Sequence, residues 1–253
     1  MGEQDILELE HSIAKKIQDI INNGLDGSEQ KRLVDLRISF MHKVDSILFH
    51  FNLIRTIKRQ AEKIIEESHK SGKIMFSQGN MRESIQLSHE LEFKYTSLME
   101  DIIYHTMSAI DNLPLIFAIY YKGVPSGLSF NSAKGALNHP HRKDFEITKK
   151  INEGWDSWVS QLHDFRAKIY HYHSKICTGT MQMNLKKDEK NEMKFGESFI
   201  ISIPRELRQA LQYSNEKDVE IEEFCDDVIK KSFNFFNEVL DIVLNEQIKL
   251  KKS

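Results

Sequence analysis

The stretch LVDLRISFMHKVDSILFHFNLI, residues 33–54, decides the fold class. Its apolar residues recur at every third or fourth position, and this spacing places them on one face of an α-helix. The stripe consists of Leu33, Leu36, Phe40, Val44, Ile47, Phe51 and Ile54, and it continues through Ala61 and Ile65. No glycine or proline interrupts the pattern before Gly72, so we predict one long helix of about ten turns.

A second amphipathic helix is predicted before this stretch. Its stripe consists of Ile6, Leu9, Ile13, Ile17 and Ile20, and Asn22-Asn23-Gly24 ends it. The turn to the long helix is expected at Asp26-Gly27-Ser28, where the Ser28 side chain is placed to cap the helix that follows.

A third helix is predicted after the long one, from about Asn80 to Tyr121. Its stripe consists of Ile85, Leu91, Tyr95, Met99, Ile102 and Met107. Pro114 should kink this helix, because proline removes one backbone hydrogen bond and clashes with the preceding turn. Residues 122–140 contain three glycines and two prolines and are expected to form a loop, and helical periodicity resumes at about Asp144.

The pattern changes after residue 176 from helical spacing to alternation. Apolar residues alternate with polar ones in two runs, which consist of Met181, Met183 and Leu185, and of Phe199, Ile201 and Ile203. A charged stretch, residues 186–192, separates the runs. Alternation around such a tip predicts a β-hairpin between about residues 178 and 203. Its tip lysines have two interpretations, a phosphate contact or a solvated turn. A last helix is predicted from Val219 to Leu250.

Together these elements predict an all-α fold, an up-and-down helical bundle with a small β-hairpin inserted before the last helix. We expect residues 1–75 to form long N-terminal helices that pack on the bundle. Residues 76–253 should form the helical domain that carries the hairpin.

Composition places the chain among globular proteins of the cytoplasm. Of its 253 residues, 40% are apolar and 29% are charged, which suits a buried core. Two cysteines, Cys177 and Cys225, are too few for a disulfide framework. The longest apolar stretch, Leu113 to Tyr121, is too short to span a bilayer, and no signal peptide is evident. We therefore expect no membrane partner.

The net charge of -3 gives no global indication of nucleic-acid binding, so any such site must be local. The sequence lacks a glycine-rich phosphate loop, a nucleophile elbow, a metalloprotease histidine pair and a CxxC motif. No cofactor is expected. Paired histidines at His139 and His141, and at His171 and His173, suggest a metal site. Residues two apart on a helix point about 200° apart, however, so His171 and His173 are poorly placed to bind one ion.

The segment from Glu153 to Lys175 carries the residues best suited to chemistry. Arg166 is followed by His171 after four intervening residues and by His173 after six. An arginine and a histidine at this spacing, preceded by Trp158 and Leu162, resemble the motif of the HEPN family. Residues 108–117, which include Asp111 and Asn112, resemble the family's second core helix, which often carries an acidic residue. The resemblance covers roughly residues 80–250.

The resemblance implies a two-fold dimer in which the motifs of both chains meet in one cleft. Active members of the family are metal-independent endoribonucleases. A histidine suits the removal of the ribose 2′-hydroxyl proton, because its pKa lies near neutrality. An arginine suits the charge that develops on the phosphate, because its planar guanidinium group matches the phosphate oxygens.

The resemblance leaves open which histidine acts with Arg166. On one straight helix the positions of Arg166 and His171 lie about 140° apart, whereas those of Arg166 and His173 lie within about 20°. Alternatively, Asp164 caps a new helix and places Arg166 in its first turn, where free amide groups help bind phosphate. Asp111 and Asn112 are expected inside an apolar helix, with Arg166, His171, a helix cap or another helix as partner.

The leading hypothesis is therefore a HEPN-like homodimer that acts as a metal-independent endoribonuclease or RNA-binding effector. By analogy with the family, its setting is defence or a toxin–antitoxin pair, with an antitoxin as protein partner. The alternative is a non-catalytic HEPN-like module that binds a nucleotide or a protein. Ala167 favours this alternative, because ribonucleases of the family usually carry a polar residue directly after the arginine.

Overall fold

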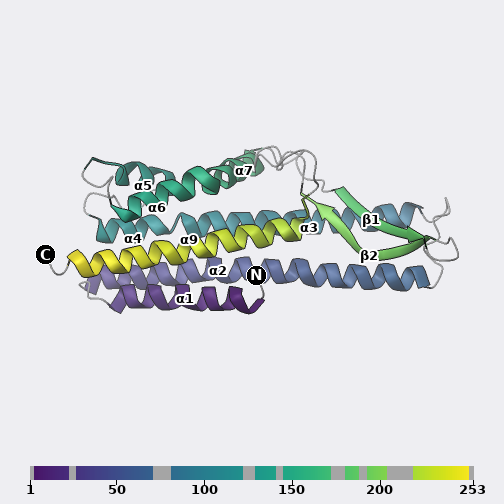
Figure 1. Cartoon of the computed structure of the whole chain (residues 1–253), viewed down its shortest axis with the longest axis horizontal. Coiled ribbons are helices and arrows are strands. Elements are labelled where there is room, and N and C mark those ends of the chain that lie inside the picture. Colours follow the sequence, from purple (N-terminus) through teal and green to yellow (C-terminus); the bar gives the residue numbers. More distant parts are fainter. Residues whose placement is uncertain are drawn as a thin grey trace. The chain divides into compact units, whose positions relative to one another are not determined.

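A computed structural model describes residues 3–22, 27–70, 81–121, 129–140, 145–171, 180–187, 193–203 and 219–250. The protein is a predominantly α-helical bundle with one antiparallel hairpin before the last helix, as the apolar spacing predicts (Figure 1). Two compact units are present. Unit 1 comprises residues 1–47, 103–163 and 227–253, and unit 2 comprises residues 48–102 and 164–226. The domain boundary predicted between residues 75 and 76 lies outside the described residues.

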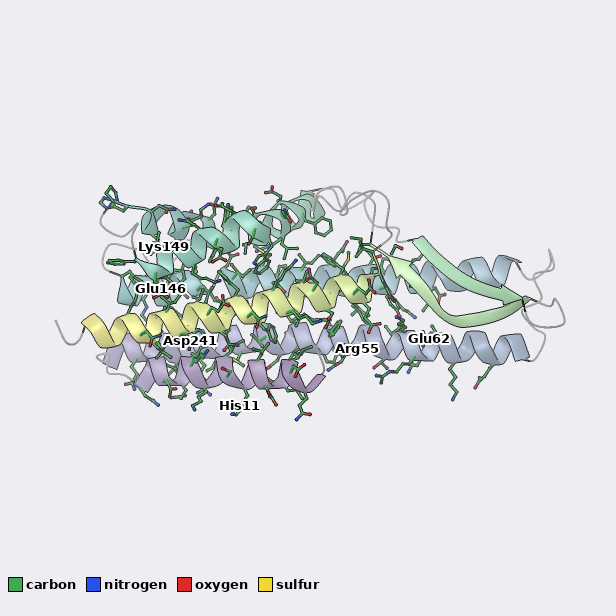
Figure 2. The ribbon with its side chains drawn as sticks, viewed as in Figure 1. His11, Arg55, Glu62, Glu146, Lys149 and Asp241 are labelled. Carbon is green, nitrogen blue, oxygen red and sulfur yellow. The ribbon has the colours of Figure 1, made fainter. Side chains whose placement is uncertain are left out.

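Unit 1 contains α1 (Glu3–Asn22), the first part of α2 (Gly27–Lys70) and most of α9 (Ile221–Leu250). The predicted stripes of α1 and α2 are buried, apart from the half-buried Leu9 and from Ile65, whose side chain is not described. Lys16 of α1 donates a hydrogen bond of 2.6 Å to Asp241 of α9, which Figure 2 labels. Phe40 of α2 meets Phe236 of α9 edge to face, with ring centroids 5.0 Å apart. None of the described helices combines the length and apolar character needed to cross a bilayer.

The third predicted helix is divided in two. α3 (Met81–Ile110) ends before a turn at Asp111 and Asn112, and α4 (Leu113–Tyr120) follows with Pro114 in its first turn. The prediction of one kinked helix was therefore wrong. A proline clashes with the carbonyl group four residues earlier, here that of Ile110, and it lacks the N–H that the helix would need. The chain instead starts a new helix, whose first turn requires no proline N–H.

A short helix, α5 (Phe130–Leu137), lies within the stretch that was predicted to be a loop. Ser129 is its N-cap residue, and the Ser129 hydroxyl accepts a hydrogen bond of 3.4 Å from the amide of Ser132. The glycine and proline content concealed this helix, although a serine cap marks its start. Helix α6 (Glu146–Gly154) begins close to the predicted position.

A five-residue π-helical turn, η1 (Trp155–Val159), connects α6 to α7 (Ser160–His171). The turn lies in unit 1, where the ring of Trp158 meets Phe235 of α9 edge to face, with centroids 5.9 Å apart. A π-turn shifts the helical phase, so positions on either side of it no longer share the face that an ideal helix would give them.

In unit 2, β1 (Thr180–Lys187) pairs with β2 (Met193–Ser202). Met181 lies opposite Ile201, and Met183 lies opposite Phe199. The predicted hairpin is therefore confirmed, and residues of the two alternating runs lie opposite one another on a shared face. The amide of Ile203 donates to the carbonyl oxygen of Val219 at 2.8 Å, which joins the base of the hairpin to the residues just before α9.

Candidate functional site

Arg166 lies in the middle of α7, which runs without a break from Ser160 to His171. Leu162 and Phe165 are buried, whereas Arg166 is half-buried and Asp164 is exposed. Asp164 is therefore not the cap of a new helix, and Arg166 does not lie in a first turn. That alternative was wrong, because the backbone irregularity occurs earlier, at the π-turn η1, and leaves the hydrogen-bond pattern of α7 continuous.

His171 is the last residue of α7, and its side chain is not described. His173 lies outside the described residues. On a regular helix the positions of Arg166 and His171 are separated by about 140°, at about 100° per residue. Helix α7 alone therefore directs the two positions to different sides. The choice between His171 and His173 remains a prediction.

Asp111 and Asn112 lie in the turn between α3 and α4, and both are half-buried. The Asp111 carboxylate accepts a hydrogen bond of 3.2 Å from the amide of Phe130, the first residue of α5. The Asn112 side-chain amide donates to the Ser39 hydroxyl of α2 at 3.5 Å. The expectation that both residues lie inside a helix was wrong, because Pro114 ends α3 before them. Of the partners that the sequence left open, Asp111 has one at the start of α5, and Asn112 has one on another helix, α2.

A hollow of about 260 Å³ adjoins Asn112 in unit 1. It is lined by Arg32, Asp35, Leu36, Ser39, Asn112 and Leu115. No sequence motif indicates this hollow, because its two sides come from α2 and from the turn and first residues of α4, far apart in the sequence. In the sequence, the feature that points to this region is a polar pair, Asp111 and Asn112, in an otherwise apolar segment.

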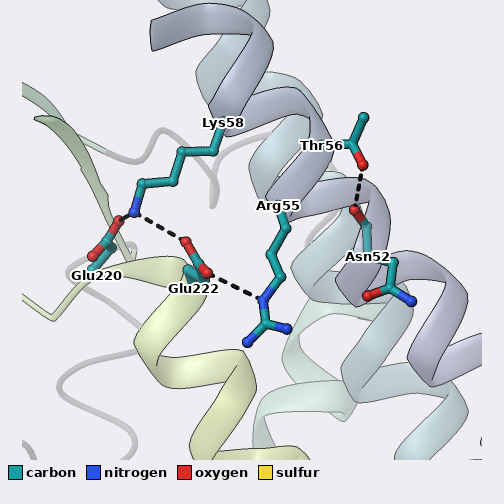
Figure 3. A network of polar contacts seen from close by, with 6 residues as sticks. All are labelled: Asn52, Arg55, Thr56, Lys58, Glu220 and Glu222. Atoms are coloured by element: carbon teal, nitrogen blue, oxygen red, sulfur yellow. Dashed lines mark hydrogen bonds and ion pairs between the residues drawn. The ribbon is translucent and has the colours of Figure 1, made fainter. Parts of the chain in front are cut away.

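Four charged residues of unit 2 form a network that the sequence did not reveal (Figure 3). Lys58 of α2 contacts Glu220 at 2.5 Å and Glu222 at 3.0 Å, and Arg55 contacts Glu222 at 3.3 Å. Burial alone would lower the pKa of Lys58, but its hydrogen bonds to Glu220 and Glu222 outweigh burial and raise the pKa. Two cations face two carboxylates, so the charges of the network cancel. We interpret it as a structural network that links α2 to the start of α9.

Cys225 of α9 is buried, and burial raises the pKa of its thiol, with further contributions from Glu222 and Asp226. A neutral buried thiol is a poor nucleophile. His139 is exposed, and His141, the other histidine of that pair, lies outside the described residues. Within the described ranges, no group of three or more histidine, cysteine, aspartate or glutamate side chains is arranged to hold a metal ion.

Comparison of the chain with protein-family models found no match, and comparison with curated proteins and with solved structures found none. The resemblance to the HEPN family therefore rests on the residues quoted above. The structural feature relevant to this resemblance is the position of Arg166 on α7 relative to the end of that helix.

Proposed function

We propose that the chain is a HEPN-like protein that acts on RNA as a homodimer and cleaves it without a metal ion. The supporting observation is the position of Arg166, half-buried in the middle of α7, with His171 at the end of the same helix. The buried neighbours Leu162 and Phe165 fix the face of the helix that Arg166 adjoins.

The proposed reaction divides two roles between Arg166 and a histidine. His171, or alternatively His173, takes the proton from the ribose 2′-hydroxyl, and the oxygen attacks the adjacent phosphorus. Arg166 stabilises the negative charge on the phosphate oxygens. The bond to the 5′-oxygen breaks and this oxygen takes up a proton from water, which leaves a 2′,3′-cyclic phosphate and a 5′-hydroxyl. Because Arg166 and His171 occupy different sides of α7, a two-fold dimer would supply them to each cleft from different chains.

The test uses purified protein, single-stranded RNA and EDTA, with the product ends analysed for 2′,3′-cyclic phosphate. Arg166→Ala and His171→Ala are each expected to lower the cleavage rate by about 10²- to 10⁴-fold. If His173→Ala alone has this effect, His173 is the base. Matched controls are Arg59→Ala and His11→Ala, whose exposed side chains lie on α2 and α1. An unchanged rate in the Arg166→Ala protein contradicts the proposal.

A second candidate function is a non-catalytic HEPN-like module that binds a nucleotide or a protein such as an antitoxin. The observation that favours it is Ala167, an exposed alanine directly after Arg166, where the family's ribonucleases usually carry a polar residue. Absence of cleavage by a correctly formed dimer, together with RNA or nucleotide binding by fluorescence anisotropy, would support this function. Ala167→Asn places the polar residue of the family's ribonucleases at this exposed position. If Ala167 is the reason that the protein does not cleave RNA, this variant should gain cleavage activity.

A further inference from the structure

The hollow beside Asn112 presents one cation and one anion on the same rim. Arg32 and Asp35 are three residues apart on α2, and residues at this spacing are neighbours on the helix surface. Both are exposed, and within the described part of the chain neither has a hydrogen bond or an ion-pair partner. Arg37, five residues after Arg32 on the same helix, differs because it donates to Gln18 of α1. The charges of Arg32 and Asp35 are thus available to a ligand.

The remaining walls of the hollow are mixed. Leu36 is buried and Leu115 is half-buried, so they give the hollow an apolar side. Asn112 is the N-cap residue of α4, but its side chain makes no capping hydrogen bond and is directed instead to Ser39. An N-cap asparagine most often bonds the first amides of its own helix. Its amide group and the Ser39 hydroxyl therefore form the polar side of the hollow.

We propose that this hollow binds a small zwitterion, an α-amino acid with an apolar side chain. A simple anion would meet the Asp35 carboxylate, and a simple cation would meet the Arg32 guanidinium group. A zwitterion satisfies both charges, with its carboxylate on Arg32 and its ammonium group on Asp35. Its side chain would lie against Leu36 and Leu115. The hollow has a volume of about 260 Å³, which leaves room for a ligand of this size.

Isothermal titration of the full-length protein tests the proposal with three probes. Leucine carries both charges, leucinamide lacks the carboxylate, and N-acetylleucine lacks the ammonium group. We expect leucine to bind, and each analogue to bind at least about tenfold more weakly, which corresponds to about 1.4 kcal/mol. Absence of leucine binding at about 10 mM, or equal affinity for all three probes, would overturn the proposal.

Two substitutions assign the charges to their residues. Arg32→Gln should weaken the binding of leucine by about tenfold but should not weaken the binding of leucinamide, because leucinamide has no carboxylate to lose and is itself a cation. Asp35→Asn should weaken leucine binding similarly but should not weaken the binding of N-acetylleucine, which has no ammonium group and is itself an anion. Arg59→Gln and Glu8→Gln are matched exposed controls, and the melting temperature of each variant verifies folding. Leucine binding that survives both Arg32→Gln and Asp35→Asn contradicts the site. Neither result depends on RNA cleavage.

Discussion

Gly154, the last residue of α6, allows the aromatic ring of Phe235 to lie directly against the backbone before η1. A Cβ atom at this position would lie 2.5 Å from Cε2 of Phe235, well inside van der Waals contact. The Phe235 ring is also in contact with Trp158 and Phe130, with centroids 5.9 and 6.1 Å apart, so it has little room to move. Because glycine has a hydrogen atom where alanine has a methyl group, α9 can pack closely against the start of the π-turn.

Gly154→Ala is therefore expected to lower the free energy of unfolding by about 1–3 kcal/mol, because the added methyl group overpacks the core. Urea denaturation followed by circular dichroism measures the change. Gly135→Ala in α5 is the matched control, since a Cβ there meets no atom within 4 Å. The control should be neutral or more stable by about 0.5–1 kcal/mol, owing to the lower flexibility of the unfolded chain. Equal destabilisation by both substitutions would show that the Phe235 contact is not the cause.

At the scale of secondary-structure elements, Lys58 joins α2 to the two carboxylates at the start of α9. Glu220 forms a backbone bridge with Ser202 at the end of β2, and Glu222 lies in the first turn of α9. One ammonium group therefore connects a helix, the base of the hairpin and a helix start. The side chains of Lys58, Glu220 and Glu222 are only 19%, 16% and 23% exposed, so solvent screens their interaction less than that of surface pairs.

Lys58→Met is expected to lower the free energy of unfolding by about 1–3 kcal/mol, because it leaves two largely buried carboxylates with fewer partners. Lys63→Met is the matched control on the same helix. Lys63 lies 3.9 Å from Glu67, and both side chains are mostly exposed. A surface pair of this kind contributes less than about 1 kcal/mol. A loss in the control as large as that of Lys58→Met would contradict the assigned role of the network.

The pH dependence of the same network has a defined sign. The folded state raises the pKa of Lys58 above its unfolded value, so protonated Lys58 stabilises the fold fully below pH about 10.4. This contribution is lost as the pH rises through the folded pKa. The stability difference between the native protein and Lys58→Met, measured in urea, should therefore be constant from pH 7 to 9 and shrink above pH about 10.4. A difference that grows at high pH would reverse the assigned sign.

At the scale of the whole molecule, the proposed ribonuclease requires two chains. Light scattering should give about twice the chain mass of 29.6 kDa, and a monomer at micromolar concentration would remove the composite site. Mixing gives a sharper test. If each cleft takes Arg166 from one chain and His171 from the other, the inactive Arg166→Ala and His171→Ala proteins should regain about a quarter of native activity when refolded together. Clefts built within one chain would remain inactive in every mixture.

Elements with a local signal could be predicted from the amino-acid sequence. The stripes through Ile13, Val44 and Ile102 predicted buried helix faces, because a helix places residues three and four apart on one side wherever it lies. The alternation around Met183 and Phe199 likewise predicted the hairpin, since residues two apart share a face of any strand.

The end of α3, the partners of the polar residues and the position of the hollow depend on packing between distant segments. The sequence predicts an effect of Pro114 but not its size, because a kink and a break differ only in how neighbouring segments accommodate the chain. Lys58 and Glu222 are 164 residues apart in sequence, and Ser39 and Asn112 are 73 apart. No local spacing relates such pairs. Their contacts exist because burial of the apolar stripes brings distant segments together, and the polar side chains then bond to whichever groups the packing has placed beside them.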